Sequence, residues 1–135
     1  MKRLATILCS LLCGQTAAAQ TCDAFAQFMS GADAPTLNGR QATCSTSKVL
    51  GEGTSTDCYW VFDYRVEEAQ RSFRNMVGDL SSCTDDGVRT EAKGVNHPDS
   101  FAQVTGRIGG QEVSLSLKDK GASGQTLIFL RAARP

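Results

Sequence analysis

Six cysteines in 135 residues constrain this chain more than any other feature, and its N-terminus decides how many of them remain. Within residues 1–19, a cationic start is followed by a mostly apolar run and then by three alanines at residues 17–19. This pattern is typical of a secretory signal peptide that is cleaved after Ala19. We therefore expect a leader over residues 1–19 and a single mature domain over residues 20–135.

Cleavage at this point removes two cysteines. The four that remain are Cys22, Cys44, Cys58 and Cys83. An even number of cysteines in a small exported domain predicts disulfides, because thiols pair in an oxidising compartment. We expect two disulfides and a periplasmic or secreted location. No later segment approaches the roughly 20 apolar residues that span a bilayer, so membrane insertion is not expected.

The lengths of two neighbouring elements predict how the cysteines pair. Cys58 begins an aromatic and β-branched segment, residues 58–62, which is typical of a strand. A helix expected over residues 65–81 would cover about 24 Å at 1.5 Å per residue. If this helix folds back along the strand, Cys83 lies beside Cys58. The sequence therefore predicts a Cys58–Cys83 disulfide and, by elimination, a Cys22–Cys44 disulfide.

The expected helix over residues 65–81 has the clearest periodicity in the chain. Apolar residues recur at steps of three and four, and charged residues fill the other side. The apolar set is Val66, Ala69, Phe73, Val77 and Leu80. A shorter helix over residues 21–29 places Phe25 and Phe28 on one side. Each helix thus has one face to bury.

Alternating residues on both sides of Gly109-Gly110 predict an antiparallel hairpin with a two-residue turn. Pairing Ile108 with Gln111 places Val104 opposite Leu115 on one face, and Arg107 opposite Glu112 on the other. The apolar pairs and the charge pair favour the same register. We therefore expect a sheet with one packed and one solvated face.

Three further strands are expected, over residues 41–50, 88–93 and 126–132, with a loop over residues 51–57. The last strand is apolar at four consecutive positions, so we expect it to be central in the sheet or covered by a helix on one side. Trp60 is expected in the core, with Tyr59 and Val61 facing the other way. The fold class predicted is α+β: an antiparallel sheet, one main helix packed on one face, a short N-terminal helix and two disulfides.

Charge and composition exclude several functions. Without Lys2 and Arg3, 12 basic residues face 14 acidic ones, whereas nucleic-acid binding needs a clustered cationic excess. His97 is the only histidine, and paired cysteines cannot supply the ligands of a zinc site. No closely spaced cysteine pair indicates a redox motif. We expect no metal, cofactor, nucleic acid or catalytic residue.

A charged segment between two strong strands, residues 118–124, is the main candidate for binding. Loops held by a rigid scaffold often carry function. The candidate binding residues are Lys118, Asp119, Lys120 and Ser123, together with His97 in an expected turn at residues 96–99. Lys118 and Lys120 suit an acidic cleft on a partner. The alternative is a solvated hairpin tip with no partner.

These observations favour an exported, disulfide-stabilised binding protein that is not an enzyme and acts on another envelope or extracellular protein. An inhibitor or immunity factor for a cell-envelope hydrolase fits this description. Two alternatives remain open, a periplasmic carrier of a small apolar ligand and a minor envelope enzyme. A carrier needs an internal cavity near Trp60 and Phe73, and an enzyme needs ionisable groups that converge in a cleft. An inhibitor needs only a protruding loop or an exposed patch.

Overall fold

A computed structural model describes residues 17–31, 36–51, 53–96 and 99–134. Most of the expected leader and His97 lie outside these residues. The elements are α1 (Ala17–Met29), β1 (Thr43–Val49), β2 (Gly53–Asp63), α2 (Glu67–Cys83), β3 (Arg89–Asn96), β4 (Asp99–Ile108), β5 (Gln111–Lys120), the 3-10 turn η1 (Gly121–Ser123) and β6 (Gln125–Arg134). Neither described helix combines the length and the apolar character that crossing a bilayer requires.

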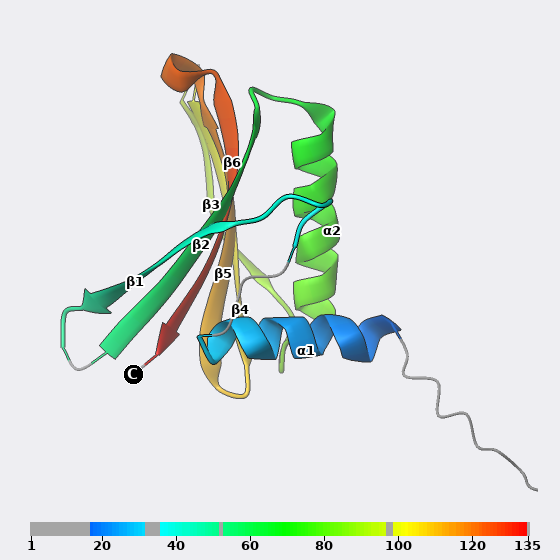
Figure 1. The fold of residues 1–135 in the computed structure, drawn as a ribbon, viewed down its shortest axis with the longest axis vertical. Helices are drawn as coiled ribbons and strands as arrows, with labels where there is room; N and C mark the ends of the chain where they lie inside the picture. The colour runs from blue at the N-terminus through cyan, green and yellow to red at the C-terminus, as the bar shows by residue number, and fades with distance from the viewer. Residues whose placement is uncertain (1–16, 32–35, 52, 97–98, 135) are drawn as a thin grey trace, which may run out of the picture.

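The six strands form one antiparallel sheet in the order β1-β2-β6-β5-β4-β3. Both helices lie on the same side of this sheet (Figure 1). The predicted α+β class is therefore confirmed. β6 was expected to be central or covered by a helix, and it is both: it lies between β2 and β5 and contacts the two helices.

The β4–β5 hairpin has the predicted register. Ile108 pairs with Gln111, and Val104 with Leu115, around the glycine turn. Arg107 also lies opposite Glu112 as predicted. The two side chains form no ion pair in the part of the chain that the structure describes. Hydrophobic patterning thus set the register without the expected charge pair.

The helices bury their apolar faces against the covered side of the sheet. The buried residues of α2 are Ala69, Ser72, Met76 and Leu80. Val66, Phe73 and Val77 are partly buried against the same core, which confirms the predicted apolar side. The helix begins two residues later than predicted. Arg65 has a φ of +54° and cannot start a right-handed helix.

The predicted N-terminal helix is confirmed over residues 21–29, although α1 begins earlier, at Ala17. Phe25 and Phe28 are buried, at 4% and 0% exposed. Cleavage after Ala19 would leave both anchoring side chains in the mature chain.

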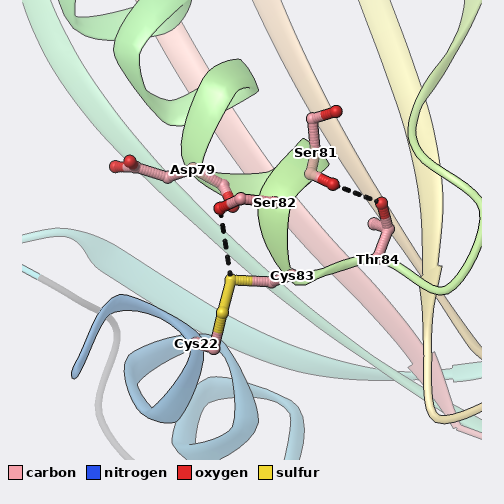
Figure 2. Close-up of a disulfide and its surroundings, with 6 residues drawn as sticks. All are labelled: Cys22, Asp79, Ser81, Ser82, Cys83 and Thr84. Atoms are coloured by element: carbon pink, nitrogen blue, oxygen red, sulfur yellow. Dashed lines mark hydrogen bonds between the residues drawn. A yellow bond between two sulfur atoms is a disulfide. The ribbon is translucent and has the colours of Figure 1, made fainter. Parts of the chain in front are cut away.

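The predicted disulfide pairing is wrong, although the number of disulfides is correct. Cys22 is bonded to Cys83, not to Cys44, and this bond joins α1 to the end of α2 (Figure 2). The error lies in the assumed path of α2. Just after the helix, the N–H of Asp85 donates to the carbonyl of Arg107 in β4. Strands β6 and β5 separate β4 from β2, so the helix crosses the sheet and carries Cys83 away from Cys58.

The second disulfide, Cys44–Cys58, joins directly opposite residues of β1 and β2. The strand predicted over residues 41–50 is confirmed, but the loop predicted over residues 51–57 is wrong from Gly53 onward. β2 begins at Gly53 because its first residues pair with β1 on one side and with β6 on the other. Cys44 and Cys58 each lie seven positions from Gly51. A hairpin centred on this glycine would have predicted their pairing.

Candidate protein-binding surface

Asp119, one of the predicted binding residues, is buried at 7% exposed. One carboxylate oxygen accepts a hydrogen bond from the Thr126 hydroxyl at 2.7 Å, and the other accepts one from Nε of Arg65 at 3.1 Å. The backbone N–H of Arg65 also donates to the Thr126 hydroxyl, at 2.8 Å. These bonds join the end of β5 to the corner between β2 and α2. Asp119 therefore anchors the segment that was predicted to bind.

The tip of this segment is the 3-10 turn η1. Lys120 and Ser123 are exposed, and the Ser123 hydroxyl donates to the carbonyl of Lys120 at 3.3 Å. Gly124 follows with a φ of +63°, and its carbonyl accepts the N–H of Tyr64 at 3.2 Å. The tip is a short turn tied at its base. It presents Lys120 and Ser123 to solvent.

Lys118 belongs to the sheet and not to the tip. Its ammonium lies 5.0 Å from the ring centroid of Phe101 in β4 and 5.1 Å from that of Phe129 in β6. Both distances fall within the range of cation–π attraction. Lys118 thus stands between two rings on the side of the sheet that carries neither helix.

We call this region the open face. It comprises Tyr59, Val61, Phe101, Lys118, Leu127 and Phe129. Strand register places them together, because Val61 is opposite Leu127, Leu127 is opposite Lys118, and Lys118 is opposite Phe101. Tyr59 lies opposite Phe129 in the next row, with ring centroids 5.6 Å apart. The open face thus crosses four adjacent strands.

The open face is apolar and accessible. Val61 is 39% exposed, whereas Leu127, opposite it in β6, is 7% exposed. Tyr59, Phe101 and Phe129 are half-buried. Trp60 is in the core at 1% exposed, as predicted, and Tyr59 and Val61 face the other way.

Towards the other end of the same side, polar side chains replace the rings. Arg131 of β6 pairs with Asp57 of β2 at 3.4 Å, and the Ser55 hydroxyl donates to the same carboxylate at 2.7 Å. The Asp57 carboxylate is thus paired with both the Arg131 charge and the Ser55 hydroxyl. The apolar open face therefore has a polar border along β2 and β6.

The described residues contain no cluster of three or more His, Cys, Asp and Glu side chains suited to a metal. Their four cysteines are all oxidised to disulfides. The buried carboxylate of Asp119 already accepts hydrogen bonds from Arg65 and Thr126. In the core, the indole N–H of Trp60 finds no hydrogen-bond partner among the residues that the structure describes.

No protein family, curated protein or solved structure matches this chain.

Part of this surface is predictable from the sequence, and the rest is not. Strand alternation predicted the outward direction of Tyr59 and Val61, and the same alternation could have placed Phe129 beside them. The bond between Arg65 and Asp119 spans 54 residues and follows from no local pattern. Nothing in the composition of residues 118–124 distinguishes a buried aspartate from an exposed one.

Proposed function

We propose that this chain is an exported, disulfide-stabilised binding protein that inhibits or neutralises a cell-envelope hydrolase. It acts in the periplasm or outside the cell and binds its partner through the open face. The observation that carries this proposal is a sheet face that neither described helix covers, on which Lys118 stands between the rings of Phe101 and Phe129, with partly exposed Tyr59 and Val61 nearby.

The residue types of the open face suit a protein partner. Aromatic side chains are enriched in the cores of protein interfaces, where they supply a large contact area at a small entropic cost. The backbone that carries the open face is also rigid. Paired strands on both sides of β6 and two disulfides fix the backbone, so that little ordering is needed on association.

The cations of β5 indicate the kind of partner. Lys118 and Lys120 are two residues apart in the same strand and therefore project from the same side of the sheet. Lys118 stands among the rings, and Lys120 is exposed near the tip. A cleft lined with carboxylates, as in many enzymes that hydrolyse glycans, complements an apolar surface with one cation among its rings and a second near its end.

The proposal is tested by affinity capture from an envelope extract with the mature, oxidised protein and three matched variants. Val61→Asp places a charge on the open face, Lys120→Asp reverses a charge at the tip, and Gln70→Asp places a charge on the exposed side of α2. All three positions are exposed, so each variant should fold. Captured proteins are identified and assayed for hydrolase activity with and without the added binding protein.

We expect the parent and Gln70→Asp to capture a hydrolase from the extract and to inhibit its activity. Val61→Asp should lose it, because an unpaired carboxylate would be buried in the interface. Lys120→Asp should weaken binding and should slow association more than it speeds dissociation. Equal retention by Val61→Asp and the parent would contradict the role of the open face. Recovery of a small apolar molecule with no specific protein would favour a carrier.

A further inference from the structure

A pocket of about 180 Å³ lies between β4 and the connection from α2 to β3. Its lining residues are Asp86, Gly87, Arg89, Thr105, Gly106 and Arg107. None of them belongs to the open face, and the charge and glycine content of this pocket set it apart from the aromatic surface.

Contacts between the connection and the β4–β5 hairpin hold this pocket open in its present shape. The N–H of Asp85 donates to the carbonyl of Arg107 at 2.8 Å. The Asp85 carboxylate accepts the backbone N–H groups of Gly109 and Gly110, at 3.4 and 3.2 Å. At Gly106, a Cβ would clash with Cγ2 of Thr84, so only glycine allows the connection to pack this closely. The pocket is thus preformed.

Arg89 and Arg107 both line the pocket, and strand register places their side chains on the side of the sheet that carries neither helix. Arg89 lies directly opposite Thr105, and Arg107 follows Thr105 by two positions in the same strand. Arg107 forms no hydrogen bond or ion pair through its side chain with any described residue. Arg89 pairs with Glu91 at 3.3 Å, but the two side chains are 71% and 42% exposed, and such a pair is readily exchanged for a ligand.

We propose that this pocket binds the carboxylate of a small, singly charged group. Two arginines and Asp86 leave one positive charge along the lining, and Glu91 beside Arg89 reduces it further, so the site suits one carboxylate better than a doubly charged phosphate or sulfate. Arginine binds carboxylates with two parallel hydrogen bonds, and Thr105 also lines the pocket, directly opposite Arg89 and two positions before Arg107. The volume is below the range of drug-sized sites and suits a group the size of one side chain.

Such a carboxylate has two sources, an acidic side chain and the C-terminus of a peptide. The test is an NMR titration of the oxidised mature protein at low salt, in which the amide of Gly87 and the side-chain N–H groups of Arg89 and Arg107 are followed. N-acetylglycine supplies a terminal carboxylate, and N-acetylglutamate with its α-carboxyl blocked as a methylamide supplies a side-chain carboxylate. N-acetylglycinamide is the uncharged control, and inorganic phosphate is the doubly charged one.

We expect saturable shifts at these groups with at least one carboxylate and none with the amide. Whichever carboxylate binds more tightly identifies the source. Arg107→Gln should weaken binding at least tenfold, whereas Arg74→Gln, an exposed residue of α2 without a side-chain partner among the described residues, should leave it unchanged.

Three results would overturn the proposal. One is the absence of saturable shifts with both carboxylates. Another is equal binding by Arg107→Gln and the parent, with the fold of the variant confirmed by its amide spectrum. The last is tighter binding of phosphate than of either carboxylate. None of these results depends on the open face, so the proposed function would survive each of them.

Discussion

The two faces of the sheet are built from the same strands and differ in what lies over them. In β2, Trp60 is 1% exposed on the helix-covered face, while its neighbour Val61 is 39% exposed on the open face. In β6, Leu130 is fully buried on the covered face, and Phe129 is half-buried on the other. One residue step along a strand thus separates the core from a surface that still carries apolar side chains.

This contrast shows how the molecule divides its hydrophobic residues. The covered face, with α1 and α2 against it, removes apolar area from water and supplies most of the folding free energy. The open face gains less on folding, because Val61 and the rings keep part of their surface in water. That remaining area is what a partner can bury. The following predictions test this division, from the largest expected effect to the smallest.

Replacing both Cys22 and Cys83 with alanine should have the largest effect. The bond joins residues 61 positions apart, and in the chain-entropy picture its loss costs about 4 kcal/mol of unfolding free energy. It also releases α1 from α2, which should expose the covered face. Denaturant titration measures the first effect, and binding of an apolar dye measures the second.

The matched control is replacement of Cys44 and Cys58 with alanine. These cysteines are 14 positions apart and join neighbouring strands, so the expected loss is about 3 kcal/mol and dye binding should rise less. A larger loss from this variant than from the helix variant would show that the covering layer does not depend on its disulfide.

Leu80→Ala should destabilise the fold by about 2–5 kcal/mol, because Leu80 is fully buried between α2 and the sheet and its truncation leaves a cavity. Val61→Ala on the open face removes a side chain that is 39% exposed, and we expect a loss below about 1 kcal/mol. Thermal and denaturant unfolding would measure both. Similar losses for the two variants would mean that the open face contributes to folding as much as the covered one.

Asp119→Asn should cost about 1–3 kcal/mol of unfolding free energy, since it weakens a partly buried, charge-assisted hydrogen bond to Arg65. Glu112→Gln, an exposed carboxylate with no ion pair in the described chain, is the control and should change stability by less than about 0.5 kcal/mol. Denaturant titration at neutral pH compares the two. If Asp119→Asn changes the unfolding free energy as little as its control does, the end of β5 is not anchored by this bond.

Local patterns predicted the parts of the fold that depend on neighbours in sequence. The turn at Gly109-Gly110 and the alternation on both sides of it defined the β4–β5 register, because a shift by one residue would move every apolar side chain to the wrong face. The three- and four-residue spacing of Phe73, Val77 and Leu80 defined the buried side of α2 in the same way.

The candidate surface was only partly predictable. Alternation in β2 assigned Tyr59 and Val61 to the face opposite Trp60, but it could not show that no described helix covers that face. The prediction placed binding in residues 118–124. The structure instead sets Lys118 between two rings of the sheet and buries Asp119.

The sequence by itself determined the strand register of the β4–β5 hairpin, the helix faces and the presence of four cysteines that form two disulfides. The tertiary structure alone decided which cysteines meet, which face stays open and which carboxylate is buried against Arg65. The physical reason is the distance along the sequence over which each interaction acts. Periodicity and turn chemistry act over a few residues, whereas Cys22–Cys83 and Arg65–Asp119 join residues 61 and 54 positions apart. The disulfide depends on how α2 crosses the sheet, and the bond between Arg65 and Asp119 depends on the strand order that places the ends of β2 and β5 on either side of β6.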